Sequence, residues 1–365
     1  MRLLWAELRD FRNHERTRLD DLPEGLVTIV GPNGEGKTNL LEGLAFLFFL
    51  ASPRSASAQP LVRTGSPAAY TRGEVETRDG RVLVEVEIPP RGASRVQVNR
   101  STVRRKRDLR RRVRAAFFGP EDLDLVRGDP SRRRGFLDDA VTSLWPAKAS
   151  AITAYERALR QRNRLLKEWE GRGSPTDLDA WDAELGTAGV QVTEARAEAI
   201  ARLGPPASSA YQELADYGLV CTYAPNVVPA AGEELAEAFE RRLAERRPDE
   251  LIRRTTLVGP HRDELELAVR DLGARAFASH GEAWAATLCL RLGLGAALEE
   301  EAGERPVLLL DDPFSALDPA RRDRAGAQLS RRGQVFVSVA DEEHVPAGSA
   351  AVYGVTAGSV IGRRT

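Results

Sequence analysis

The chain has 365 residues, of which 42% are hydrophobic and 29% are charged, and its formal net charge is −1. This length and composition predict a soluble globular protein with two lobes and exclude an intrinsically disordered chain. No apolar run approaches the roughly 18 residues that a membrane span needs, and the first residues lack the pattern of a cleaved signal peptide, so we expect a cytoplasmic protein without a membrane partner.

A phosphate-binding loop is predicted near the N-terminus. Residues 26–30 (LVTIV) form an apolar run typical of a buried parallel strand, and a helical pattern begins at Asn39. The residues between them fit G-x-x-x-x-G-K-[ST], and they are Gly31, Pro32, Asn33, Gly34, Glu35, Gly36, Lys37 and Thr38. In such a loop the backbone amides surround phosphates, the lysine contacts the β- and γ-phosphates, and the threonine hydroxyl ligates Mg²⁺. The pattern therefore predicts ATP and Mg²⁺ as cofactors.

A strongly basic run follows a predicted hairpin. Residues 83–88 and 95–103 alternate in polarity like a hairpin at a sheet edge, and the basic residues after them are Arg104, Arg105, Lys106, Arg107, Arg110, Arg111, Arg112 and Arg114. Such a run can follow a DNA backbone through contacts that ignore base sequence and weaken with salt. A solvated face, or a docking surface for an acidic protein, is the alternative. No aromatic residues are interleaved with the run, so a duplex or a single-strand/duplex junction suits it better than a bare single strand.

Two helices are predicted in the middle of the chain. The first apolar seam contains Ile152, Tyr155, Leu159, Leu166 and Trp169 and is interrupted by Arg162; the second contains Leu178, Trp181, Leu185, Ala188, Val192, Ala195 and Ala199. A Gly/Pro-containing turn at 171–177 joins them, so an antiparallel helical hairpin is expected over about 147–203. An ordinary helical layer packed on the lobe is the alternative.

A second buried strand, at 307–310, is followed by two acids. Asp311 is the expected Mg²⁺ ligand together with Thr38, and Asp312 is placed to orient or activate the attacking water, which makes Asp312 and Lys37 the predicted catalytic residues. The residues that follow, Ser315 to Asp318, are similar to the D-loop of ATP-binding-cassette (ABC) ATPases.

A shorter stretch before this strand resembles the cassette signature, usually Leu-Ser-Gly-Gly-Gln. Its residues are Ser279, His280, Gly281 and Glu282, with His280 in place of a glycine. In ABC ATPases this motif contacts the γ-phosphate bound by a second copy of the protein, so the match predicts an ATP-dependent homodimer with the signature acting in trans. A helix N-cap alone is the alternative for Ser279.

Four segments together resemble the RecF family of bacterial recombinational-repair proteins: RDFRNH at 9–14, GPNGEGKTNLLEG at 31–43, FFGPEDLDLVRGDPSRRRGFLD at 117–138 and VGPHRDEL at 258–265. The resemblance implies that Arg12 and Asn13 lie near the ATP. It also implies a role in DNA replication, repair and recombination and in the SOS response, at gapped or junction DNA. There the family acts with RecR and RecO to load RecA onto strands covered by single-strand-binding protein. The arginines at 132–134 are expected either to hold the two lobes together or to contact DNA.

Two departures from the cassette pattern favour slow turnover. Asp312 stands where many cassette ATPases have glutamate, and the histidine expected after the strand at 334–340 is displaced to His344. No glutamine marks the Q-loop, where Glu121 or Asp122 are candidates. We therefore expect a weak, DNA-stimulated ATPase that serves as a switch.

The expected fold is α/β: an ABC-type P-loop ATPase head with a second, mainly helical lobe that carries the short helical hairpin. The predicted ATP-binding lobe comprises residues 1–115 and 302–365, and the predicted inserted lobe is 116–301, including the signature at 279–282. A transporter-type ABC subunit is one alternative, disfavoured by the 117–138 segment. An SMC-like structural tether is another, disfavoured by the short hairpin.

Overall fold

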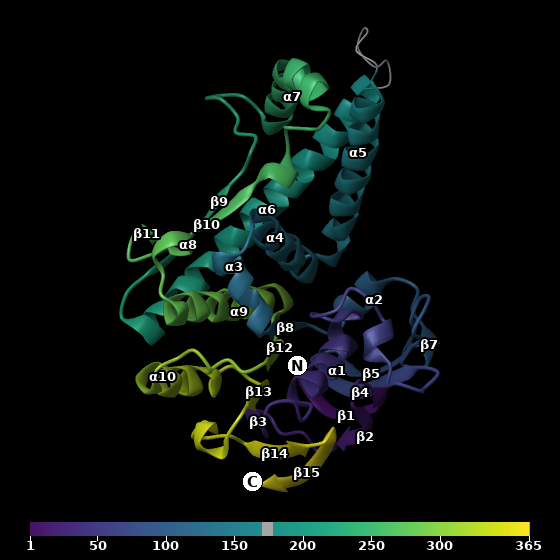
Figure 1. The fold of residues 1–365 in the computed structure, drawn as a ribbon, viewed down its shortest axis with the longest axis vertical. Coiled ribbons are helices and arrows are strands. Elements are labelled where there is room, and N and C mark those ends of the chain that lie inside the picture. Colours follow the sequence, from purple (N-terminus) through teal and green to yellow (C-terminus); the bar gives the residue numbers. More distant parts are fainter. Residues whose placement is uncertain (170–177, 365) are drawn as a thin grey trace. The chain divides into compact units, whose positions relative to one another are not determined.

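The computed structural model describes residues 1–169 and 178–364 (Figure 1). The predicted turn at 171–177 lies outside these residues. Contacts divide the chain into two compact units: unit 1 is Met1–Leu123, Pro205–Leu219 and Phe277–Thr365, and unit 2 is Asp124–Gly204 and Val220–Ala276. In the ranges described, no helix combines the length and the apolar character needed to cross a bilayer.

Two sheets are described in unit 1. The antiparallel sheet has the order β2-β1-β4-β5-β6-β7, with β1 Arg2–Phe11, β2 His14–Leu19, β4 Ala69–Thr77, β5 Gly80–Ile88, β6 Arg95–Val98 and β7 Ser101–Thr102. One face of β5 is buried and the other is not, as its alternating sequence requires. The predicted edge hairpin is confirmed, because β5 pairs with β6 and β6 with β7 at the end of this sheet.

The second sheet carries the ends of the strands that form the site. Its order is β15-β14-β3-β13-β12-β8, with β3 Leu26–Val30, β8 Ala115–Phe118, β12 Val307–Leu310, β13 Val335–Val339, β14 Ala351–Thr356 and β15 Ser359–Arg364. Strands β14, β3, β13, β12 and β8 pair in parallel. β3, β12 and β13 are buried along their whole length, which explains their continuous apolar sequences.

Helix α1, Lys37–Phe49, lies between these two sheets. It contacts β1, β4 and β5 of one sheet and β8, β12 and β13 of the other. It is buried from Leu40 to Phe48, as expected for a helix that is apolar on every side. The other helices of unit 1 are α2 Lys106–Arg110, the C-terminal part of α6 from Pro205 to Ala215, α9 His280–Ala302, α10 Pro319–Leu329, and the short 3₁₀ turns η1 Gln59–Leu61, η2 Pro120–Leu123 and η5 Glu342–His344. The position of α1 fixes the phosphate loop at its N-terminal end.

Unit 2 is mainly helical. Its elements are α3 Asp124–Arg127, α4 Pro130–Leu144, η3 Pro146–Lys148, α5 Ala149–Glu168, most of α6 Leu178–Ala215, β9 Leu219–Ala224, α7 Leu235–Arg253, η4 Pro260–Arg262, β10 Glu264–Val269, β11 Leu272–Gly273 and α8 Ala274–Phe277. A core of Tyr155, Ala158, Leu185, Val192, Phe239 and Leu243 joins α5, α6 and α7. The two predicted helices therefore pack against α7 as well as against each other.

The interruption of the first seam has a structural reason. Arg162 is fully buried and donates hydrogen bonds to Glu250 (2.6 Å), Thr256 (3.0 Å) and Asp182 (2.5 Å). Glu250 is itself fully buried, so the arginine neutralises a carboxylate inside the core. The division into units also differs from the predicted lobes: residues 116–123, 205–219 and 277–301 of the predicted lobe 116–301 belong to unit 1. The last of these segments contains nearly all of α9, which contacts β8 and η2 of unit 1.

Candidate nucleotide-binding site

The loop between β3 and α1 has the backbone conformation that its glycines allow. Gly34 and Gly36 have φ values of +87° and +113°, which favour glycine. A Cβ on Gly36 would also approach Asn13 to 2.7 Å and His14 to 3.1 Å. The spacing of the motif therefore reflects both turn geometry and the close approach of the β1–β2 turn.

Lys37 begins α1 and is buried. Its ammonium group donates hydrogen bonds to the carbonyls of Gly31 and Pro32, the second at 2.9 Å. Burial lowers the pKa of Lys37, and the charges of Asp312 and Asp311 act in the opposite direction. The lysine thus lies inside the loop with two carboxylates nearby, where it can contact phosphate oxygens.

The strand ends bring the two predicted acids to the loop. Thr38 Oγ1 donates to Asp311 Oδ1 at 3.0 Å, and Ser338 Oγ donates to the same oxygen at 2.7 Å. The backbone amide of Asp312 donates to Ser338 Oγ at 2.8 Å. The parallel pairing of β12 with β13 produces this arrangement, because it aligns the carboxyl ends of the two strands.

Both acids are affected by burial. Burial raises the pKa of Asp311, and hydrogen bonds from Ser338 and Thr38 partly offset the effect. Burial also raises the pKa of Asp312, with partial compensation from the charge of Lys37. In the described ranges no cluster of three or more His, Cys, Asp or Glu side chains could hold a metal ion. Thr38 and Asp311 offer two oxygen ligands, which fits Mg²⁺, since Mg²⁺ is usually held by one or two protein groups together with phosphates and water.

The turn between β1 and β2 lies against the phosphate loop. Arg12 donates two hydrogen bonds, of 2.9 and 2.7 Å, to the fully buried Glu42 of α1. Asn13 donates to the carbonyl of Glu35 at 3.2 Å and accepts from Asn39 at 2.8 Å. Arg12 therefore supports the loop through α1, whereas Asn13 contacts the loop directly.

His14 is a site residue that our reasoning from the sequence missed. Its Nε2 lies 3.0 Å from the carbonyl of Gly36, and its Nδ1 lies 2.8 Å from Thr17 Oγ1. Burial lowers the pKa of His14, so the ring is expected to be neutral at physiological pH. Its presence in RDFRNH was the available signal.

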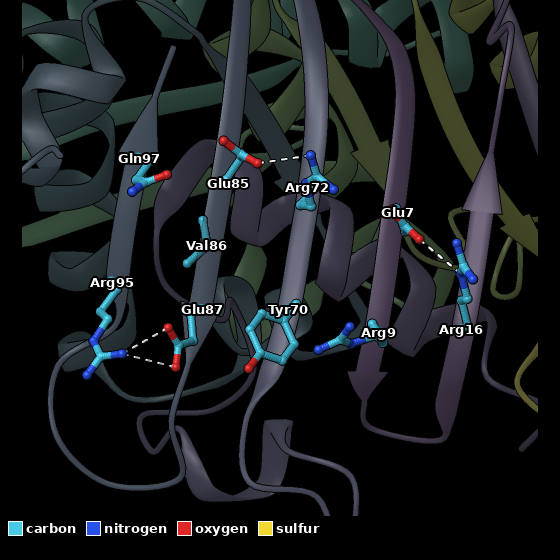
Figure 2. A pocket seen from close by; sticks show the side chains of 10 residues that line it. All are labelled: Glu7, Arg9, Arg16, Tyr70, Arg72, Glu85, Val86, Glu87, Arg95 and Gln97. Atoms are coloured by element: carbon cyan, nitrogen blue, oxygen red, sulfur yellow. Dashed lines mark hydrogen bonds and ion pairs between the residues drawn. The ribbon is translucent and has the colours of Figure 1, made fainter. Parts of the chain in front are cut away.

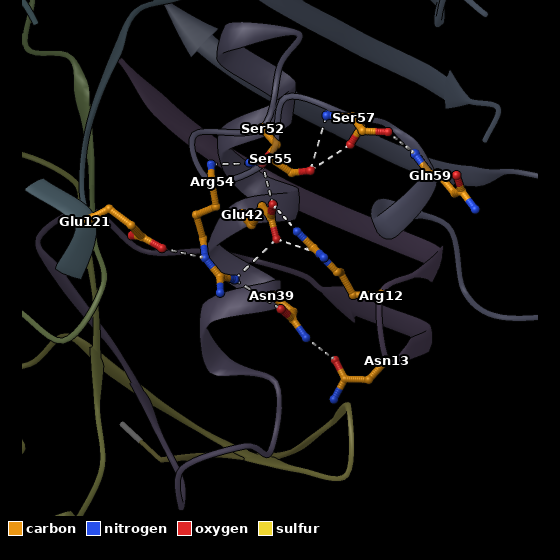
Figure 3. Close-up of polar contacts among 10 residues, drawn as sticks. All are labelled: Arg12, Asn13, Asn39, Glu42, Ser52, Arg54, Ser55, Ser57, Gln59 and Glu121. Carbon is orange, nitrogen blue, oxygen red and sulfur yellow. Dashed lines mark hydrogen bonds and ion pairs between the residues drawn. The ribbon is translucent and has the colours of Figure 1, made fainter. Parts of the chain in front are cut away.

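Arg54 and Glu42 form a second group that the sequence did not reveal (Figure 3). Arg54 lies 3.4 Å from Glu121, 3.4 Å from the Asn39 side-chain oxygen and 3.5 Å from Glu42. Its charge lowers the pKa of Asp311, although burial has the larger, opposite effect. Arg54 stands in a serine-rich loop without a motif, so nothing in the local sequence marked it.

The Q-loop candidates have different surroundings. Asp122 accepts hydrogen bonds from the Arg291 guanidinium at 2.6 and 3.0 Å and from the amide of Gly119 at 3.2 Å. The hydrogen bonds of Asp122 therefore hold the loop after β8 in place. Glu121 is more exposed and has Arg54 as its partner, and the charge of Arg54 also acts on Asp311.

The predicted signature begins α9. Ser279 is the N-cap residue: its Oγ accepts from the amide of Glu282 at 3.3 Å, and its own amide donates to the Glu282 carboxylate at 2.8 Å. Glu282 is buried and also accepts from Tyr217 at 2.6 Å. Ser279 therefore caps the helix, and the cap uses its Oγ as an acceptor. Among the residues that the structure describes, the hydroxyl proton of Ser279 has no acceptor. His280 is exposed, like Ser279.

The signature and the D-loop touch within unit 1. A Cβ on Gly281 would lie 3.0 Å from the carbonyl of Ala316, so the glycine permits this contact. Ser315 Oγ donates to the carbonyl of Asp312 at 3.2 Å. Asp318 caps α10 by accepting from the amide of Arg321 at 3.0 Å. The displaced His344 lies 3.8 Å from Asp341, and its charge lowers the pKa of Asp312, although burial has the larger, opposite effect.

The residues of the predicted DNA-binding run differ in their exposure to solvent. Arg104, Arg105, Lys106, Arg111 and Arg112 are exposed, whereas Arg107 and Arg110 are partly buried. Arg110 donates to the carbonyl of Phe49 at 3.4 Å, and Arg107 lies 4.0 Å from Asp108. Only part of the run is thus fully presented to solvent.

Two family-like segments have structural roles in unit 2. Arg133 is buried and donates to Glu264 at 2.6 and 2.8 Å, so its strongest contacts lie within one unit. In the segment at 258–265, Asp263 pairs with Arg196, which also pairs with Asp138. These residues fix the helical unit.

Comparisons with known proteins show the family to which the chain belongs. The chain matches the family described as RecF/RecN/SMC N terminal domain over residues 3–360. It is 41% identical to the DNA replication and repair protein RecF of Cutibacterium acnes, with 93% of this chain and 92% of that protein covered. It is 42% identical to RecF of Streptomyces avermitilis, with 95% of both chains covered.

Solved structures show the same fold. A structure of the recombination mediator protein RecF with ATP, from the RecFOR pathway, superposes with a TM-score of 0.87 at 28% identity and covers 100% of this chain and 97% of that one. The Smc head domain of Pyrococcus furiosus superposes with a TM-score of 0.58 at 15% identity, covering 100% and 96% of the two chains. The second likeness concerns the fold alone.

Proposed function

Because this chain belongs to the RecF family and has an ABC-type ATPase head, we propose that it is an ATP-dependent DNA clamp acting in replication, repair and recombination. One observation carries the proposal: Lys37, Thr38, Asp311 and Asp312 converge at one phosphate loop, with Ser338 holding the acid pair. This arrangement supplies the groups that one chain contributes to a cassette ATP site.

ATP is the proposed ligand, held by residues 31–38, with Arg12 and Asn13 supporting the loop. Thr38 and Asp311 would hold Mg²⁺, which neutralises phosphate charge when bound. Asp312 is the proposed base that orients water. Its carboxylate is one methylene shorter than the glutamate of many cassette ATPases, and this shorter reach favours slow hydrolysis that serves as a switch.

The second half of each site is proposed to come from another copy of the chain. Ser279 and His280 are exposed at the N-terminal end of α9, where helix amides and a serine proton favour an anion. Gly281 and Glu282 hold this end in place through Ala316 and Tyr217. ATP bound to one copy would thus join two heads, and its hydrolysis would release them.

Gapped DNA or a single-strand/duplex junction is the proposed substrate, and the exposed part of the 104–112 run is the proposed contact. By family likeness, RecR and RecO are the proposed partners in loading RecA onto strands covered by single-strand-binding protein, in the cytoplasm and within the SOS response. The transporter alternative loses its support, because the matched relatives are RecF proteins.

Sedimentation velocity with fluorescent gapped DNA tests this proposal. The protein with ATP and Mg²⁺ should sediment as a dimer bound to DNA, and with ADP as a monomer that binds DNA more weakly. Lys37→Met should remove the effect of ATP. A protein whose oligomeric state and DNA affinity are the same with ATP, with ADP and without nucleotide would contradict the clamp.

A further inference from the structure

Two of the hollows in unit 1 that arginines line differ in how the positive charge is compensated. The larger, of about 780 Å³, lies on the open face of the antiparallel sheet (Figure 2). Its arginines face glutamates on adjacent strands: Arg16 with Glu7, Arg72 with Glu85 and Arg95 with Glu87, at 3.0, 3.0 and 3.2 Å. The fourth, Arg9, lies over the ring of Tyr70. The glutamates thus neutralise most of the positive charge of the arginines, and little net positive charge remains to attract an anion.

The smaller hollow, of about 450 Å³, has uncompensated charge. It lies beside the C-terminal end of α1, and its rim carries Arg104 and Lys106. No carboxylate lines it among the residues described, and over the same ranges neither cation makes an ion pair. Partial desolvation of the exposed Lys106 at the rim of the hollow and the charge of Arg110 both lower the pKa of Lys106, which agrees with a cation that lacks a nearby anion.

The floor and walls of this hollow are apolar or carry small hydroxyl groups. Phe46, Leu50, Leu61 and Val96 form a buried floor. Ser52, Ser55, Ser57 and Ser94 lie around it, and Gly92 and Ala93 leave one wall without bulk. An apolar floor of this size, with a few polar groups and two cations at the rim, matches a small ligand that has a flat apolar part and an anionic part.

The serines have assigned hydrogen bonds that leave some protons free. Ser55 Oγ donates to the carbonyl of Ser57 at 2.8 Å, while Ser57 Oγ accepts from the amide of Gln59 at 3.3 Å (Figure 3). Ser57 is exposed and donates to no group within residues 1–169 or 178–364. Its proton can therefore bond to a base or a phosphate.

We propose that this pocket binds one unstacked nucleotide of a DNA strand, with the base against the apolar floor and the backbone phosphate on Arg104 and Lys106. The inference rests on the proposed DNA-binding function and assigns a chemical purpose to the first part of the basic run. A paired base in a duplex cannot enter such a hollow, whereas an unpaired base does so at the lowest cost. The pocket thus selects the single-stranded side of a gap or junction.

The pocket is connected to the nucleotide site through the serine loop. Ser52 Oγ donates to Glu42, the carboxylate that Arg12 and Arg54 also contact. The charge of Arg54 in turn reaches Asp311. A DNA nucleotide in the pocket would therefore contact the serine loop, 52–57, whose Arg54 acts electrostatically on Asp311.

The charge of the rim is tested by fluorescence anisotropy with gapped DNA over a range of KCl concentrations. The double variant Arg104→Glu, Lys106→Glu should bind roughly tenfold more weakly, and its salt slope should fall by about two phosphate contacts. The matched control is Arg111→Glu, Arg112→Glu, which reverses two exposed charges of the same run that do not line the pocket. If both double variants lose the same affinity for gapped DNA, the charges act by diffuse attraction of the DNA backbone, and the proposed pocket is wrong.

The space of the pocket is tested without changing charge. Ala93→Trp fills the hollow and should lower affinity for gapped DNA about fivefold or more while leaving affinity for a fully paired duplex unchanged. Ala231→Trp, on an exposed loop of unit 2, is the control for the added indole. If Ala93→Trp binds gapped DNA as tightly as the unmodified protein, the proposed pocket is wrong, but the proposed DNA-binding function still stands. If the unmodified protein binds no DNA with or without ATP, the proposed function fails, and this inference fails with it.

Discussion

The hydroxyl of Thr38 donates a hydrogen bond of 3.0 Å to Oδ1 of Asp311, and this bond joins residues 273 positions apart. One residue belongs to the phosphate loop, and the other follows β12, which comes after the helical unit in the sequence. Ser338 Oγ contacts the same carboxylate oxygen from the neighbouring strand. The acid pair is therefore oriented before a ligand arrives, which limits the reorganisation that binding requires.

Replacing Thr38 separates this role from general folding. Thr38→Ala removes one oxygen ligand and should lower ATP affinity in the presence of Mg²⁺ roughly tenfold, or about 1.4 kcal/mol. Affinity in EDTA should change little, because the backbone amides of the loop remain. Thr38→Ser keeps the hydroxyl and serves as the control. Isothermal titration calorimetry with and without Mg²⁺ checks this, and an equal loss under both conditions would count against a metal-binding role.

Substitution of Ser279 separates the helix cap from the contact in trans. Ser279→Asp keeps an N-cap acceptor and should preserve stability, but it places a carboxylate where the γ-phosphate of a second copy is proposed to bind. ATP binding should stay within about twofold of the unmodified protein, while ATP-dependent dimerisation is lost. Sedimentation with ATP and Mg²⁺ measures both. A Ser279→Asp protein that still dimerises would defeat the model of a shared site.

Asp311 is expected to reduce the stability of the ligand-free protein. Burial raises its folded-state pKa above the unfolded value, so the folded protein favours the protonated carboxyl over the charged one. The contribution of Asp311 to stability is therefore fully present below the unfolded pKa, where the carboxyl is protonated, and is lost as pH rises through the folded pKa. Asp311→Asn removes the buried charge but keeps an acceptor for Thr38 and Ser338. Its melting temperature should exceed that of the unmodified protein, with a larger difference at about pH 8 than at about pH 5. Mg²⁺-dependent ATP binding should fall sharply. A lower melting temperature at both pH values would show that the carboxylate stabilises the fold.

The parts of the site that could be predicted from sequence are those that local geometry dictates. A phosphate loop needs its glycines and lysine at fixed spacing, so the local sequence predicts it. A buried strand followed by two acids can likewise be predicted from its own residues. Likewise, the alternation in 83–88 predicted the edge hairpin.

The parts that could not be predicted depend on tertiary contacts. Glu42 lies on a helix buried on every side and looks like an isolated charge in the sequence, yet Arg12, Ser52 and Arg54 converge on it. Arg162 looked like an interruption of an apolar seam, because its partners Glu250 and Thr256 come from a distant part of the chain. A buried polar group becomes intelligible only when its partner is known.

The Arg162 cluster gives a last prediction, for the helical unit. Arg162→Leu leaves Glu250 buried without its cation, which should lower the free energy of unfolding by about 3–5 kcal/mol. Arg164→Leu, two residues along the same helix, is the control. Arg164 is 71% exposed and pairs with Glu168 at 2.8 Å, and loss of such a surface pair should cost under about 0.5 kcal/mol.

Adding Glu250→Gln to Arg162→Leu removes the unpaired charge but keeps an acceptor for the amide of Leu257. The double variant should therefore recover part of the lost stability. Urea denaturation measures all three variants. If the double variant is less stable than Arg162→Leu, the damage comes from lost packing and not from the buried carboxylate.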